Sequence, residues 1–195
     1  VQHNPGRGVI PHVKKVQRYL RGTLRLPTTF TNESDCSQMR YSSDASHAAL
    51  VNFNSTGATI AYLGKNIFFA KSVKQRLVTV SSTAAEIVQF DYSSRHAHWA
   101  TDFCADINMP ITLPVQFDED NSSAIQLFTG AQWKTTRWIG VRYHSLIEKI
   151  KSGFGFLNYV PTDKLASDHL TKPSKTKTAF MAFRDALLNG ISARR

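Results

Sequence analysis

Three extended segments in a row, followed at once by a long helical segment, constrain the fold of this chain most. The extended segments are expected at residues 39–45, 57–63 and 66–73, with a turn at 64–66 that joins the last two as a hairpin. Over residues 83–107 the apolar positions recur at helical spacing instead. The order predicts an antiparallel sheet against which one long helix buries its apolar side.

Strands and helices alternate in the rest of the chain. Strands are expected at 115–120 and 154–160, and helices at 121–128, 136–152, 164–171 and 176–189. Strands separated by helices add to a sheet in parallel, whereas hairpin strands add antiparallel. The sequence therefore predicts an α/β fold with a mixed five-stranded sheet flanked by helices.

The amino-terminal part precedes this sheet. Residues 11–22 predict a short basic helix with Val13, Val16 and Leu20 on one face and Gly22 at its end. Residues 23–37 are rich in Thr, Asn and Ser and are expected to be a connector.

Composition limits the partners and the compartment. The 195 residues are 42% hydrophobic, which is enough for a core, and the net charge of +10 favours a polyanionic partner such as nucleic acid. Cys36 and Cys104 are the only cysteines, which excludes a disulfide framework and a Cys-rich zinc site. The sequence shows no apolar stretch of the roughly 18 residues that a membrane span needs and no secretory leader, so an intracellular protein is expected.

Four acids fall at the ends of expected elements. Asp44 lies near the end of the first strand, Glu86 in the first turn of the long helix, Asp120 at the end of the fourth strand and Asp168 in the first turn of a late helix. Carboxylates gathered in one cleft repel one another unless a cation is present. Mg²⁺ prefers oxygen ligands, and two such ions can support phosphodiester hydrolysis. The four acids are therefore candidate metal ligands.

Each acid also has a local explanation. Glu86 could be the return arm of a capping box with Thr83, and Asp120 or Asn121 could simply cap the short helix. Asp168 could interact favourably with a helix dipole, and Asp44 could lie in a turn. His169, next to the last acid, is either a packing residue or a neighbour of the site.

Basic and polar residues before the long helix are candidates for phosphate binding. Lys71, Lys74, Gln75 and Arg76 cluster there, and Asn121 is a further candidate for binding nucleic acid. The alternative for the cluster is a solvated turn. Contacts of this kind would give affinity for nucleic acid without sequence preference.

Several motifs run in the order found in one known family. These are 41–45 (YSSDA), 81–86 (SSTAAE), 120–125 (DNSSAI), 141–144 (VRYH), 159–162 (YVPT) and 166–173 (ASDHLTKP). Over about residues 12–190 the chain resembles the RNase H domain of copia-type retrotransposon polyproteins. The resemblance implies an RNase H-like fold in which Asp44, Glu86, Asp120 and Asp168 bind two Mg²⁺ ions, or Mn²⁺, and cleave the RNA strand of an RNA/DNA hybrid.

The resemblance also divides the chain. Residues 18–23 (RYLRGT) resemble the end of the family's reverse transcriptase region. Residues 1–30 are then a remnant of the reverse transcriptase connection segment, and residues 31–195 are the RNase H-like domain. The polymerase region of the same polyprotein becomes an expected partner, in a cytoplasmic virus-like particle or in the nucleus.

Departures from the family's motifs keep other functions open. Gly140 stands where the family has Asp, and Ser46 and His47 replace a second Asp and a Trp after Asp44. One alternative is a domesticated, weakly active or inactive module that binds nucleic acid or supports a larger assembly. Another keeps the fold but changes the nucleic acid that is cut.

Overall fold

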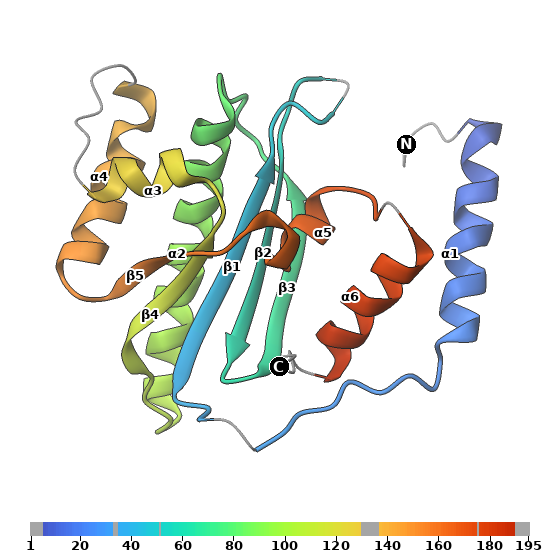
Figure 1. Ribbon diagram of the computed structural model, residues 1–195, viewed down its shortest axis with the longest axis horizontal. Helices are drawn as coiled ribbons and strands as arrows, with labels where there is room; N and C mark the ends of the chain where they lie inside the picture. The colour runs from blue at the N-terminus through green and yellow to red at the C-terminus, as the bar shows by residue number, and fades with distance from the viewer. Residues whose placement is uncertain (1–5, 33–34, 51, 130–136, 175, 190–195) are drawn as a thin grey trace.

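The computed structural model describes residues 6–32, 35–50, 52–129, 137–174 and 176–189. Within these ranges a five-stranded sheet carries helices on both faces (Figure 1). The strands are β1 (Gln38–Ser46), β2 (Thr56–Leu63), β3 (Asn66–Lys74), β4 (Thr112–Glu119) and β5 (Gly155–Tyr159). The helices are α1 (Ile10–Gly22), α2 (Ser82–Asp106), α3 (Ser122–Thr129), α4 (Arg137–Lys151), α5 (Asp168–Thr171) and α6 (Lys177–Asn189). Two 3-10 turns are η1 (Arg7–Val9) and η2 (Thr162–Lys164).

The sheet is mixed, as the sequence predicts. Its strand order is β3-β2-β1-β4-β5, with antiparallel pairs between β1, β2 and β3 and parallel pairs between β1, β4 and β5. β1 and β4 are therefore neighbours that run in the same direction, although β2, β3 and α2 separate them in the sequence. Their carboxyl ends lie at one edge of the sheet.

The main core lies between the sheet and α2. Tyr41 of β1, Phe117 of β4, and Ile87 and Phe90 of α2 are each no more than 2% exposed. Successive strand residues face opposite sides, so the residues that alternate with Tyr41 face α5 instead. The hydroxyls of Ser42 and Ser167, 2.9 Å apart, join β1 to the residue before α5.

One expected helix has a different form. Residues 164–171 predict continuous helix, but the structure has η2, an extended Leu165 and then the four-residue α5. Leu165 is 2% exposed, and its extended backbone interrupts the helix and leaves this side chain buried. Tertiary burial here overrides helical periodicity.

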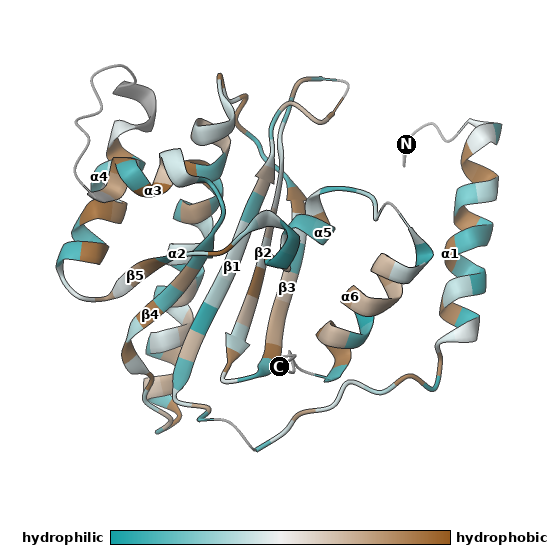
Figure 2. Cartoon of the chain, viewed as in Figure 1, coloured by the Kyte–Doolittle hydropathy of each residue, from teal (hydrophilic) through white to brown (hydrophobic). Residues whose placement is uncertain are grey.

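α1 is a helix with the expected end, but its apolar side is not buried. Val13, Val16 and Leu20 are 48%, 58% and 56% exposed, and hydrophobic and hydrophilic residues are mixed along the helix (Figure 2). An edge contact between the rings of Tyr19 and Phe180, 5.5 Å apart, joins α1 to α6. None of the helices in the described ranges is both long and apolar enough to cross a membrane.

Candidate active site

Parallel pairing of β1 and β4 brings two of the acids together. Ser42 pairs with Asp118, so Asp44, two residues further, lies level with Asp120 just beyond the end of β4. Asp120 is thus outside the strand that was expected to contain it. Its carboxylate accepts a hydrogen bond of 2.6 Å from the hydroxyl of Thr162.

α2 supplies the third acid from the same edge. β3 ends there, because its last residue, Lys74, pairs with Thr56 and so with the end of β1. Ser81 caps the helix that follows, its side chain accepting a hydrogen bond of 3.1 Å from the Ala84 amide. The capping box expected between Thr83 and Glu86 is therefore wrong, because Ser81 is the cap residue.

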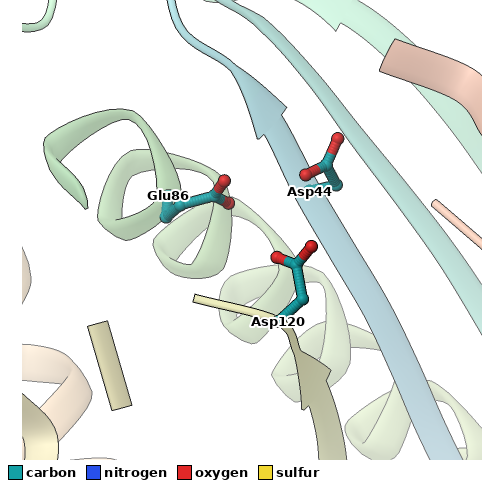
Figure 3. A group of neighbouring side chains, drawn as sticks. All are labelled: Asp44, Glu86 and Asp120. Atoms are coloured by element: carbon teal, nitrogen blue, oxygen red, sulfur yellow. The ribbon is translucent and has the colours of Figure 1, made fainter. Parts of the chain in front are cut away.

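Asp44, Glu86 and Asp120 form one cluster (Figure 3). Each offers a carboxylate oxygen, and the three ligand atoms lie within 4.8 Å of one another. Asp44 is 2% exposed and Glu86 is 5% exposed, whereas Asp120 is half-buried. Three carboxylates this close, and this shielded from water, are costly without a compensating positive charge.

The electrostatics show that cost. Burial raises the pKa of Asp44, and the charges of Asp120 and Asp168 add to this, while a hydrogen bond from Thr171 and the charge of Lys172 oppose it. Burial raises the pKa of Glu86 well above its usual range, and the charges of Glu119, Asp44 and Asp120 add to it.

One carboxylate oxygen of Glu86 is available to bind a cation. Glu86 Oε2 is buried and lacks a hydrogen-bond partner among the described residues. A buried acceptor without a partner is uncommon and calls for an explanation such as an ion. An all-oxygen donor set with such an acceptor fits a hard divalent cation such as Mg²⁺ or Mn²⁺.

Asp168 lies beside this cluster rather than in it. It is the first residue of α5, and its charge reaches Asp44. Its carboxylate, 23% exposed, forms an ion pair with Lys172 one turn later. The next residue back, Thr171, donates a short hydrogen bond from its hydroxyl to Asp44. Asp168 therefore lies next to the cluster, and α5 connects the two through the hydrogen bond from Thr171 to Asp44.

Glu119 is a fifth acid that the sequence analysis did not single out. It is the last residue of β4, is 2% exposed and accepts a 3.1 Å hydrogen bond from the Asn121 amide. Burial, with the charges of Asp120 and Asp44, raises its pKa to about 8. Strand alternation was the available signal, since Glu119 continues the core-facing series of Val115 and Phe117.

The expected phosphate-binding cluster divides into exposed cations and one buried amide. Lys71, Lys74 and Arg76 are exposed. Lys71 Nζ donates a 3.1 Å hydrogen bond to the Tyr92 hydroxyl. Gln75 is 5% exposed and donates from Nε2 to the Ala85 carbonyl at 2.9 Å. Its expected role in phosphate binding is therefore wrong, because its side chain is buried and joins two parts of the fold.

Two other candidates have local partners. Asn121 Oδ1 accepts a 3.1 Å hydrogen bond from the Ala124 amide and so caps α3. This frees its neighbour Asp120 from the capping role. The ring of His169 stacks on Phe183 with centroids 4.6 Å apart, which is the packing role rather than a place among the acids.

A sheet in which an antiparallel β1-β2-β3 unit is extended by parallel β4 and β5, with acids at the ends of β1 and β4, defines the RNase H-like class. The chain superposes on LC11-RNase H1, isolated from compost by a metagenomic approach, with a TM-score of 0.52 and 13% identity over 69% of this chain and 92% of that one. The same protein in complex with an RNA/DNA hybrid gives a TM-score of 0.51 and 12% identity over 68% and 93% of the two chains. At this identity the likeness establishes the fold.

Sequence comparison gives the narrower relationship. The chain is 28% identical over 183 residues, 93% of its length, to the retrovirus-related Pol polyprotein from transposon RE1 of Arabidopsis thaliana. It is 29% identical over 173 residues, 88% of its length, to the corresponding polyprotein from transposon RE2 of the same plant. No protein-family model matches it. Over nearly its whole length the chain is thus similar to a segment of retrotransposon Pol polyproteins, and it spans 12% of the length of each of these relatives.

Proposed function

We propose that this domain is a Mg²⁺-dependent endonuclease that hydrolyses the RNA strand of RNA/DNA hybrids. The observation that carries the proposal is the cluster of Asp44, Glu86 and Asp120, with three ligand atoms within 4.8 Å and a buried, unpartnered Glu86 Oε2. A purely structural cluster of acids would be expected to use its buried acceptors in hydrogen bonds.

The four acids have different tasks in this proposal. Asp44, Glu86 and Asp120 would hold the divalent ions, and Asp168, whose charge reaches Asp44, would add a fourth carboxylate. Bound Mg²⁺ would supply the activation of the attacking water and the stabilisation of the departing 3′ oxygen. Thr171 and Thr162 orient Asp44 and Asp120 through their hydroxyls, so both carboxylates are positioned before any ligand arrives.

The surface around the acids supports a polyanionic substrate. Lys74, the last residue of β3, and Arg76, just after it, are exposed at the edge of the sheet where the acids lie. The net charge of +10 adds a long-range attraction for phosphates. The structural relative LC11-RNase H1 has been described in complex with an RNA/DNA hybrid, and we assign the same substrate class to this chain.

The amino-terminal helix supports a place within a longer polyprotein. We assign residues 1–30 to the end of the reverse transcriptase region and residues 31–195 to the RNase H-like domain; residues 1–5 lie outside the described ranges. The exposed apolar side of α1, with Val13, Val16 and Leu20, fits packing against a preceding polymerase region.

The test is metal-dependent cleavage of an end-labelled RNA/DNA hybrid by the wild type, Asp44→Asn and Asp120→Asn. We expect cleavage of the RNA strand in Mg²⁺ and at least about a hundredfold loss in either variant, since each removes a ligand of the ions. Duplex RNA and duplex DNA serve as competing substrates. Full activity in Asp44→Asn would exclude the proposed site.

Asp102→Asn is the matched control. Asp102 is exposed on the same helix as Glu86, 16 positions further along, which is about 24 Å of helix at 1.5 Å per residue. This variant should keep wild-type cleavage. Binding of the hybrid with no cleavage by the wild type would instead support a nucleic-acid-binding module.

A further inference from the structure

Lys172 places a positive charge beside the acidic cluster. Its ammonium forms an ion pair with Asp168, and the Lys172 side chain is 49% exposed. It follows directly after Thr171, whose hydroxyl is bound to Asp44. Among the described residues, Lys172 is the cation in an ion pair with an acid of the site, and it comes from the segment that also holds Asp44.

The backbone that carries Lys172 is fixed at several points. Ser167 before α5 is bound to Ser42 of β1, and the carbonyl of Leu170 accepts a 2.7 Å hydrogen bond from the hydroxyl of Ser72 on β3. The Lys172 amide donates to the Asp168 carbonyl at 3.2 Å. The base of the side chain is therefore anchored, while its four-carbon stem leaves the ammonium free to move.

The ammonium interacts with more than its ion-pair partner. Burial lowers the pKa of Lys172, but the hydrogen bond with Asp168 and the charges of Asp44, Asp168 and Asp120 outweigh this and raise it. In return, the charge of Lys172 lowers the pKa of Asp44. Lys172 thus already supplies part of the positive charge that these carboxylates need.

We propose that Lys172 is a tethered cation that occupies the Asp168 side of the acidic site and must leave Asp168 before a second divalent ion binds there. This inference rests on the proposed two-ion function. The first ion binds at Asp44, Glu86 and Asp120, which are free of ion pairs with Lys172. The second ion competes with the ammonium, so Lys172 sets the Mg²⁺ concentration at which the site is fully loaded.

The wild type should bind its second Mg²⁺ ion more weakly than its first, and removing the charge of Lys172 should reduce this difference. In Lys172→Met the second ion no longer displaces a charge, so its dissociation constant should fall about two- to fivefold, the range that a partly exposed ion pair can supply. The first dissociation constant should change less. Lys172→Arg keeps the charge and should retain the weak second step.

The experiment is calorimetric titration of the 195-residue chain with Mg²⁺, in the absence of nucleic acid. Lys151→Met is the matched control. It removes the same positive charge from an exposed position at the end of α4, which is not part of the acidic site. A second dissociation constant that falls in Lys172→Met but not in Lys151→Met supports the inference. Equal changes in both variants, or none, would overturn it.

A measurement on the wild type tests the same inference without substitution. The ¹³Cε resonance of Lys172 should shift during the second binding step and stay in place during the first. A shift confined to the first step would overturn the inference while leaving metal binding intact. If the wild type binds no Mg²⁺ at all, the inference and the proposed nuclease site both fail.

Discussion

Glu119, the last residue of β4, raises the pKa of Glu86 in α2 through its negative charge. Burial is the largest cause of the raised pKa of Glu86, and the negative charge of Glu119 is the next. Two acids from different elements therefore share a poorly hydrated region beside the proposed metal ligands. Glu119 itself has its pKa raised to about 8 from an ordinary value of 4.5.

Stability without metal should fall as pH rises. Between pH 4.5 and about 8 folded Glu119 keeps a proton that the unfolded chain releases, so raising the pH through this window favours unfolding. Glu119→Gln removes this titration and preserves an acceptor for the Asn121 amide. We expect the variant to be more stable than the wild type at pH 8, by roughly 2–5 kcal/mol, and little changed at pH 4.5.

Urea unfolding at several pH values in a chelator measures the effect. Glu148→Gln makes the same chemical change at an exposed position of α4, and should alter stability by less than about 0.5 kcal/mol throughout. A Glu119→Gln protein with the same pH slope as the wild type would show that Glu119 is ionised in the folded state.

The hydrogen bond from Thr171 to Asp44 should affect the low-pH side of activity. This bond lowers the pKa of Asp44 against the effect of burial. In Thr171→Val the pKa of Asp44 rises further, so the carboxylate is protonated at a higher pH and loses Mg²⁺ there. We expect hybrid cleavage to fall about three- to tenfold at pH 6 and less at pH 8.

A pH–rate profile distinguishes this effect from loss of structure. Thr101→Val is the control, because the Thr101 hydroxyl donates to the Ala97 carbonyl within α2 at 2.8 Å, away from the acids. A uniform loss at every pH in Thr171→Val would indicate that Thr171 only anchors α5.

The acids that were predicted correctly as neighbours are those placed by regular structure. Asp44 and Asp120 follow from two parallel strands whose carboxyl ends meet, and Glu86 from α2, which begins after the loop that follows β3. These relationships depend on element order, which hydrophobic periodicity predicts. Element order therefore predicts where each of the three acids lies along the chain, whereas the pairing of β1 with β4 that brings them together is seen in the structure.

Glu119 and Lys172 could not be placed in the same way. Glu119 depends on the face that the last residue of β4 turns toward α2, which requires the strand's end to be known within one residue. Lys172 depends on α5, a four-residue helix held by side-chain hydrogen bonds to β1 and β3. A helix this short has too little intrinsic propensity to be predicted from its residues alone.

A close contact at Gly57 should make that position intolerant of a side chain. A Cβ there would lie 1.7 Å from Gln89 Oε1, and Gln89 is 2% exposed and hydrogen-bonded to Thr59 at 2.7 Å. Gly57→Ala must therefore displace Gln89, one turn after Glu86, and we expect a loss of about 1–3 kcal/mol in the free energy of unfolding.

Gly140→Ala provides the opposite expectation. Gly140 lies in α4, and a Cβ there meets nothing within 4 Å. Alanine should stabilise this helix position by about 0.5–1 kcal/mol. Chemical unfolding of both variants measures the two effects. Destabilisation of the same size in both would contradict the assigned role of Gly57, because only Gly57 has a side chain in its way.

Mg²⁺ should stabilise the folded domain through the three-acid cluster. A ligand at 100 times its dissociation constant adds about 2.7 kcal/mol to stability, which for a chain of this length corresponds to an increase in Tm of about 5–10 °C.

Asp120→Asn removes one ligand and also a charge that raises the pKa of Asp44, Glu86 and Glu119. Without metal this variant should therefore melt above the wild type. Adding Mg²⁺ should then raise its Tm by less than about 2 °C. Thermal denaturation at pH 8, in excess chelator and in excess Mg²⁺, measures both differences. The exposed Asp102→Asn should behave as the wild type does in both conditions. An equal Mg²⁺-induced shift in the wild type and Asp120→Asn would place the ion elsewhere on the protein.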